Sequence, residues 1–158
     1  GVVGKGLDVN DKVKNTIEIA FSSFEEDLWK DYDKTLFTSL KNSLKEYMNI
    51  VSKYNVRIPQ NIYDIGFQIQ KYEKGKGKYI WHQDFSVEKN FHRWLTFLWY
   101  LNDVDDDGGG ETEFYDGTAI KPKVGTILLF PATWTYVHRG CELKSGVKYI
   151  CTGWMAHR

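Results

Sequence analysis

The chain has 158 residues, and its 21 Lys and Arg residues balance 21 Asp and Glu residues, so the formal net charge is zero. This length fits one domain, residues 1–158, that can bury about 70 % of its unfolded surface. Zero net charge argues against a dedicated nucleic-acid binder, and the lack of a run of about 18 apolar residues argues against a membrane span. We therefore expect a monomer without nucleic-acid or membrane partners.

The two cysteines, Cys141 and Cys151, are too few for a disulfide framework. A reducing compartment is the simpler interpretation, so we expect a cytoplasmic location. No signal-peptide pattern is visible. Because the sequence starts at Gly1 rather than at a methionine, a removed leader would leave no trace in it.

The first 60 residues are expected to form a helical support. Residues 23–54 begin with a capping-box pattern, Ser23 and Glu26. Apolar side chains follow at helical spacing along one face: Leu28, Tyr32, Leu36, Leu40, Leu44, Tyr47, Met48 and Val51. A helix of about 30 residues would be about 45 Å long, more than a small domain needs, so we expect a break near Thr38-Ser39.

Residues 61–158 are expected to form the core of the domain. The stretch Arg57-Ile58-Pro59 ends the helix, and from Ile62 onward short apolar runs alternate with turns that contain Gly and Asp. Aromatic residues make up 16 % of the chain, which favours a β-rich core. The pattern predicts a mainly β fold with supporting helices, namely a double-stranded β-helix (jelly roll) covered by N-terminal helices.

His82 and Asp84 form an HxD pair in the segment GKGKYIWHQDF, whose composition predicts a strand. Residues at i and i+2 of a strand share a face, so one strand would supply two metal ligands. With His138 they make the two-histidine, one-carboxylate ligand set of non-haem Fe(II) centres, which leaves coordination positions open. Each motif is weak alone, because a single histidine in an aromatic strand is more often a hydrogen-bonded core residue.

Lys148 follows His138 by ten residues, which suits a cation that binds the distal carboxylate of a 2-oxo acid. The segment HRGCELKSGVKYICTGW predicts two short strands around a turn at residues 144–146. In a simple two-residue hairpin His138 and Lys148 would point to opposite faces. We therefore expect a bulge or an odd loop near Gly140 or Gly146.

The chain also resembles the prolyl 4-hydroxylase family of 2-oxoglutarate/Fe(II)-dependent dioxygenases over about residues 65 to 155. Six blocks follow the family's order and spacing: QKYEKGKGKYIWHQD, RWLTFLWYLNDV, GGGETEF, KPKVGTILLFP, HRG and GVKYICTGW. Lysine at position 148 is similar to the collagen, plant and microbial enzymes, whereas the oxygen-sensing prolyl hydroxylases have arginine there.

The resemblance implies a role for eight residues. His82, Asp84 and His138 would bind Fe(II), and Lys148 would bind the C5 carboxylate of 2-oxoglutarate. Four more residues would line or adjoin the co-substrate pocket: Tyr72, Tyr100, Thr96 and Trp154. The implied cofactors are Fe(II) and 2-oxoglutarate, with ascorbate as a candidate reductant.

The implied reaction is hydroxylation of peptidyl proline at C4, with succinate and CO2 as co-products. The same cofactor chemistry on a free amino acid, another protein residue or a nucleobase remains an alternative, as does a binding module without a working triad. Neutral charge disfavours nucleobase chemistry, and the intact ligand set disfavours a dead site. Four aromatic residues are candidates for dry pocket walls or, equally, for core packing: Tyr79, Trp81, Trp99 and Trp134.

Two loops of opposite charge suggest how a peptide substrate could be held. Lysines at 71, 74, 76 and 78 precede the HxD pair, while aspartates at 103, 105, 106 and 107 follow Tyr100, and glycines interrupt both loops. Glycine-hinged loops could close over an extended, proline-containing peptide. The alternative is that both are ordinary solvated loops.

Overall fold

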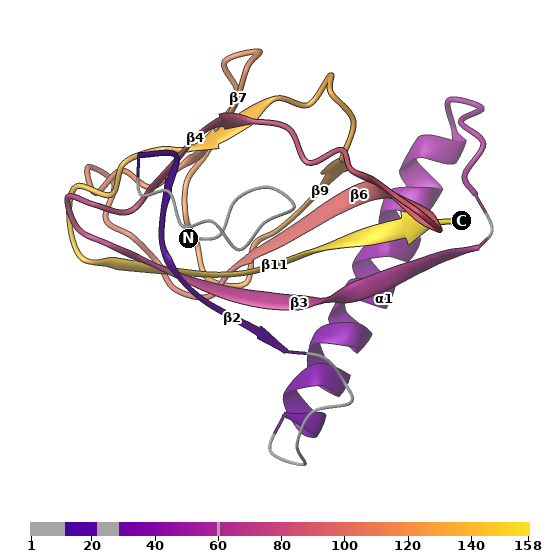
Figure 1. Ribbon diagram of the computed structural model, residues 1–158, viewed down its shortest axis with the longest axis horizontal. Helices are drawn as coiled ribbons and strands as arrows, with labels where there is room; N and C mark the ends of the chain where they lie inside the picture. Colours follow the sequence, from indigo (N-terminus) through magenta and orange to yellow (C-terminus); the bar gives the residue numbers. More distant parts are fainter. Residues whose placement is uncertain (1–11, 22–28, 60) are drawn as a thin grey trace.

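The computed structural model describes residues 12–21, 29–59 and 61–158. Two antiparallel sheets lie over one another (Figure 1). Residues of both sheets line a cavity between them. The six-stranded sheet has the order β2 (Ile17–Phe21), β3 (Ile62–Glu73), β11 (Val147–His157), β6 (Phe91–Tyr100) and β5 (Val87–Glu88), and β9 (Ile127–Pro131) also pairs with β6. The five-stranded sheet has the order β1 (Lys14–Asn15), β4 (Lys78–His82), β10 (His138–Gly140), β7 (Thr112–Phe114) and β8 (Ala119–Ile120). This arrangement is the expected mainly β jelly roll.

The two faces of the six-stranded sheet have different roles. Because side chains alternate along a strand, Phe97 and Trp99 of β6 point to the outer face, where they pack with Leu40 of helix α1 (Lys30–Ser52). Thr96 and Leu98 point to the inner face and line the cavity. Helix α1 therefore supports the sheet from outside, as Figure 1 shows, and contributes no side chain to the cavity wall in the described residues.

The N-terminal region differs from the expectation in two respects. Helix α1 is continuous over 23 residues, so the predicted break near Thr38-Ser39 is wrong. The hydroxyl of Thr38 donates to the backbone oxygen of Lys34 and thereby stays within the helix instead of interrupting it. Residues 1–60 do not all form helical support, because β1 is a strand of the five-stranded sheet and β2 is a strand of the six-stranded sheet. The capping box, Ser23 and Glu26, lies outside the described residues.

The predicted hairpin between His138 and Lys148 is also wrong. Strand β10 pairs with β4 and β7, whereas β11 pairs with β3 and β6, so the two strands belong to different sheets. His138 and Lys148 both point inward because the two sheets face each other. The expected irregularity does exist, between His138 and Gly140, but it lies in the pairing of β10 with β4.

Two further observations concern the cysteines and the helix. The thiols of Cys141 and Cys151, which both lie within the described residues, are free. Among the described residues, no helix is long and apolar enough to cross a membrane.

Candidate metal centre and co-substrate pocket

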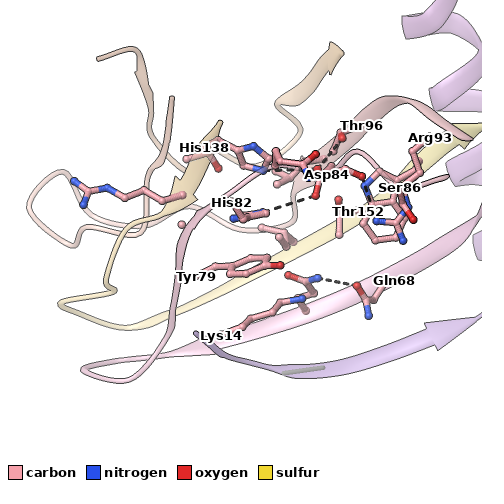
Figure 2. A pocket seen from close by; sticks show the side chains of 18 of the residues that line it. Lys14, Gln68, Tyr79, His82, Asp84, Ser86, Arg93, Thr96, His138 and Thr152 are labelled. Carbon is pink, nitrogen blue, oxygen red and sulfur yellow. Dashed lines mark hydrogen bonds and ion pairs between the residues drawn. The ribbon is translucent and has the colours of Figure 1, made fainter. Parts of the chain in front are cut away.

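The three expected metal ligands come together at one end of the cavity (Figure 2). His82 is the last residue of β4, and His138, the first residue of β10, lies opposite it. Asp84 is two residues beyond the end of β4, so the strand itself supplies one ligand rather than two. One ligand atom from each of the three residues lies within 4.8 Å of the others.

Backbone carbonyls determine which nitrogen each histidine offers. Nδ1 of His82 lies 2.8 Å from the oxygen of Ile80, and Nδ1 of His138 lies 3.0 Å from the oxygen of Tyr136. A carbonyl can only accept a hydrogen bond, so Nδ1 donates in both rings. A neutral ring that donates from Nδ1 carries its free lone pair on Nε2. Both Nε2 atoms lie 3.7 Å from oxygens of Asp84.

The electrostatics of this cluster favour a bound cation. Burial, together with His138, lowers the pKa of His82 to about 4, which leaves its ring neutral at pH 7. Burial raises the pKa of Asp84, but the two histidines and the hydroxyl of Thr96 lower it by more, so the carboxylate is ionised. The hydroxyl of Thr96 donates to Asp84 Oδ2 over 2.7 Å. Two imidazole lone pairs and one carboxylate therefore converge in a set that suits Fe(II).

Aromatic rings hold the two histidine ligands in place. Tyr79 stacks on His82 with ring centroids 3.5 Å apart. On the other side, Phe130 and Phe114 pack against His138 with centroids 4.9 and 5.8 Å away. Ligands that cannot turn are preorganised for metal binding.

The cavity beside the cluster has a volume of about 700 Å³ and lies between the two sheets. Lys148 lines it and is only 2 % exposed. Its ammonium donates to the backbone oxygen of Gly110 over 2.7 Å and lies 4.2 Å from the ring centroid of Tyr72. Burial lowers the pKa of Lys148 to about 8. A buried ammonium that faces a cavity suits one end of an anionic ligand.

Gly110 allows its carbonyl to reach the lysine. Its φ angle is +77°, and a Cβ atom there would lie 2.9 Å from Leu143 Cδ1 and 3.4 Å from Lys148 Cδ. A larger residue would therefore be strained and would also crowd the lysine.

Comparison with known proteins assigns this site to a family. The sequence model of the 2OG-Fe(II) oxygenase superfamily matches residues 67–156, which include all three metal ligands and Lys148. The chain belongs to this superfamily. Fe(II) and 2-oxoglutarate, the cofactors in the family's description, are those that the ligand set and the buried lysine suit.

Individual relatives of this oxygenase include hydroxylases from bacteria and plants. It is 34 % identical over 90 residues to a PKHD-type hydroxylase of Synechococcus sp. strain CC9902, covering 55 % of this chain and 39 % of that protein. It is 34 % identical over 122 residues to the probable prolyl 4-hydroxylase 3 of Arabidopsis thaliana, covering 57 % and 42 %. The chain thus spans about two fifths of the length of these relatives.

Solved structures share the fold. The viral collagen prolyl hydroxylase of Paramecium Bursaria Chlorella virus-1, in a 2OG complex, superposes with a TM-score of 0.72 at 24 % identity, covering 92 % of this chain and 81 % of that one. A prolyl hydroxylase from Trichoplax adhaerens, in complex with a hypoxia inducible factor peptide fragment, has a TM-score of 0.72 at 19 % identity, covering 98 % and 68 %. The expectation of a prolyl hydroxylase-like jelly roll is confirmed.

Four residues were expected to line or adjoin the co-substrate pocket, and three of them reach the cavity. Tyr72, Thr96 and Trp154 line it, as expected. Tyr100 is fully buried and is not among the described residues that line the cavity. Its hydroxyl instead contacts Thr112 Oγ1 at 2.7 Å and the oxygen of Ile120 at 3.0 Å. The expected contact of Tyr100 with the co-substrate is therefore replaced by support of Thr112, which does line the cavity.

Sequence patterns missed several lining residues. Arg93 stacks on the ring of Trp154 at 3.6 Å and donates to the backbone oxygen of Asp84 over 3.4 Å. Gln68 and Gln70 lie on the inner face of β3 with Tyr72, and strict alternation along that strand could have identified them. Lys14 also lines the cavity, but no local sequence signal links β1 to residues so distant.

The aromatic residues expected as pocket walls have different locations. Tyr79 lines the cavity of the oxygenase. Trp99 follows the alternative of core packing, because it packs on the outer face near helix α1. Trp81 and Trp134 are 38 % and 73 % exposed, so they are available to a molecule outside the cavity.

The charged loops, for which a peptide clamp and ordinary solvated loops are the two alternatives, lie away from the cavity wall. In the described part of the chain, none of their lysines or aspartates lines the cavity. Both loops are hydrogen-bonded to the segment before β11: the amide of Gly75 donates to Leu143, the amide of Leu143 donates to Gly77, and the amide of Lys144 donates to Gly108. Gly77 and Gly109 serve close backbone contacts, since a Cβ there would clash with the backbone of Tyr72 and Glu73 or with the oxygen of Glu142, whereas a Cβ at Gly75 would meet nothing within 4 Å.

Proposed function

We propose that this chain is a 2-oxoglutarate-dependent oxygenase that hydroxylates peptidyl proline at C4. The observation that carries this proposal is the buried ammonium of Lys148 in the same cavity as His82, Asp84 and His138. The reaction converts 2-oxoglutarate, O2 and a C–H bond into succinate, CO2 and an alcohol. One oxygen atom of O2 enters the alcohol and the other enters succinate. When bound, Fe(II) supplies the O2 chemistry.

The protein's own residues position the reactants. Lys148 would bind the distal carboxylate of the co-substrate with a charge-assisted hydrogen bond. Thr96 holds the carboxylate of Asp84, and the carbonyls of Ile80 and Tyr136 hold the two imidazoles. Enclosure between the two sheets limits water near the reacting groups.

Exposed aromatic rings near the metal ligands support a peptide substrate. Trp81 is next to His82 in β4, makes an edge-to-face contact with Tyr115 at 5.9 Å, and carries the guanidinium of Arg139 over its ring at 4.6 Å. Tyr115 is 80 % exposed. Extended proline-containing segments bind well to aromatic surfaces because their polyproline II shape loses little entropy on binding. The names of the relatives and structural neighbours agree with proline as the target.

The test is to incubate the purified protein with Fe(II), 2-oxoglutarate, ascorbate and proline-containing peptides, and to measure mass gain. We expect one added oxygen on proline, identified after hydrolysis as 4-hydroxyproline, and none with the His138→Ala variant or with peptides in which alanine replaces proline. Oxygen gain only on free proline or on another residue would refute the substrate assignment. Absence of any 2-oxoglutarate turnover by the wild-type protein would refute the proposal as a whole.

A further inference from the structure

A chain of hydrogen bonds runs along the inner face of β3 and ends at the co-substrate pocket. The hydroxyl of Tyr72 donates to Gln70 Oε1 over 2.7 Å, and Gln70 Nε2 donates to Gln68 Oε1 over 2.8 Å. Gln68 Nε2 in turn donates to Glu18 Oε2 over 3.3 Å. Glu18 lies on β2, opposite Gln70 of β3. Three side chains, Glu18, Gln68 and Gln70, therefore connect strand β2 to Tyr72.

The anchor of this chain is held from both sheets. Glu18 of β2, in the six-stranded sheet, forms an ion pair with Lys14 of β1, in the five-stranded sheet. Both side chains are nearly buried, at 8 % and 6 % exposure. The ammonium of Lys14 also lies 4.9 Å from the ring centroid of Tyr79. Figure 2 shows Lys14, Gln68 and Tyr79 on the same side of the pocket.

The carboxylate of Glu18 determines which group donates in every hydrogen bond from Gln68 to Tyr72. An ionised carboxylate only accepts hydrogen bonds, so Gln68 must offer its amide nitrogen to Glu18. The carbonyl of Gln68 is then left to accept from Gln70, and the carbonyl of Gln70 is left to accept from Tyr72. The hydroxyl proton of Tyr72 consequently points along β3, and its oxygen offers only lone pairs to the pocket.

Tyr72 lies close to the group expected to bind the co-substrate. It is the cross-strand neighbour of Lys148, whose ammonium is 4.2 Å from the centre of its ring. A carboxylate bound to that ammonium would be within reach of the Tyr72 hydroxyl. The hydroxyl oxygen presents only lone pairs to it, however, and these do not attract the lone pairs of the carboxylate. If the proton could turn toward the pocket, Tyr72 would add a hydrogen bond to the carboxylate.

We propose that Glu18 is a positioning residue that acts through Gln68 and Gln70 to hold the hydroxyl proton of Tyr72 away from the distal carboxylate of the co-substrate. The inference rests on the proposed role of 2-oxoglutarate. It makes the N-terminal strands part of the co-substrate pocket, although neither carries a metal ligand. This chain of hydrogen bonds weakens co-substrate binding, so a substitution that interrupts it strengthens that binding.

The experiment measures the dissociation constant of 2-oxoglutarate by calorimetry, with Zn(II) in place of iron so that no turnover occurs. Two variants interrupt the chain: Glu18→Gln, which allows its direction to reverse, and Gln68→Met, which keeps the ion pair of Glu18 with Lys14. Each is made alone and together with Tyr72→Phe, which removes the hydroxyl. Glu73→Gln, a matched loss of charge at a half-exposed position of β3, is the control.

We expect Glu18→Gln and Gln68→Met to tighten binding about three- to tenfold, the value of one added hydrogen bond. In the Tyr72→Phe background, neither substitution should change the dissociation constant from that of Tyr72→Phe alone. The control Glu73→Gln should bind 2-oxoglutarate as the wild type does. General damage to the pocket would weaken binding instead. Unchanged or weaker binding, or an equal change with and without the hydroxyl, would overturn the inference. If Glu18→Gln unfolds the protein, Gln68→Met still tests the inference. If the wild-type protein does not bind 2-oxoglutarate, that result counts against the proposed function and not against the role of Glu18.

Discussion

At the scale of single residues, the proposed role of Lys148 predicts that co-substrate binding can be weakened while metal binding is kept. Its ammonium lies in the co-substrate pocket, and the three metal ligands are other residues. Lys148→Ala should raise the concentration of 2-oxoglutarate required for half-saturation by about 30-fold or more, because a buried carboxylate would lose its charged partner. Metal affinity, measured separately by calorimetry, should change little. An equal loss of both affinities would contradict the assigned role.

The same residue predicts how co-substrate binding depends on pH. Burial lowers the pKa of Lys148 to about 8, so in the free protein the side chain loses its charge as the pH rises past that value. Because the carboxylate binds the charged form, 2-oxoglutarate affinity should fall above about pH 8 and binding there should take up a proton. Lys148→Arg should bind more weakly, since the planar fork does not fit a pocket shaped for lysine, but its affinity should not fall between pH 7 and 9.5. Calorimetry in buffers of different ionisation enthalpy measures both quantities.

At the scale of elements, helix α1 is expected to contribute stability and not chemistry. Leu40 is its one fully buried residue among those described and packs against Phe67, Leu95 and other outer-face side chains of the sheet. Leu40→Ala should lower the free energy of unfolding by about 2–4 kcal/mol. Phe37→Ala, at a half-exposed position of the same helix, should cost less than about 1 kcal/mol. Urea denaturation measures both, and 2-oxoglutarate affinity should be the same in the two folded variants; a lower affinity for Leu40→Ala would show that the helix shapes the pocket.

At the scale of the whole molecule, the site joins the two sheets. His82 and His138 belong to the five-stranded sheet, while Asp84 is held by Thr96 of the six-stranded sheet, which also carries Lys148. A metal that binds only the folded protein should therefore stabilise the whole domain, by about 2.7 kcal/mol at 100 times its dissociation constant. Mn(II), which avoids oxidation, should raise the melting temperature of the wild-type protein. The His138→Ala variant should show no such rise, and a rise equal to that of the wild type would place the metal elsewhere.

The sequence alone identified His82, Asp84, His138 and Lys148 as candidate site residues, from the HxD pair, the ten-residue spacing between His138 and Lys148 and the resemblance to a family. Short apolar runs separated by turns that contain Gly and Asp likewise predicted a jelly roll. Sheet partners join residues far apart in the chain, and no local pattern encodes them. For that reason β10 and β11 were wrongly expected to form one hairpin.

The same limit applies to the surroundings of the site. Only the tertiary structure decided that the backbone oxygens of Ile80 and Tyr136 select the free nitrogen of each histidine, and that the carbonyl of Gly110 meets Lys148. It also decided that Tyr100 supports Thr112 from behind, and that Glu18 connects to Tyr72 across 54 positions of the sequence. The chemistry depends on which atoms a side chain presents, and those are selected by hydrogen bonds and packing that form only when distant strands come together.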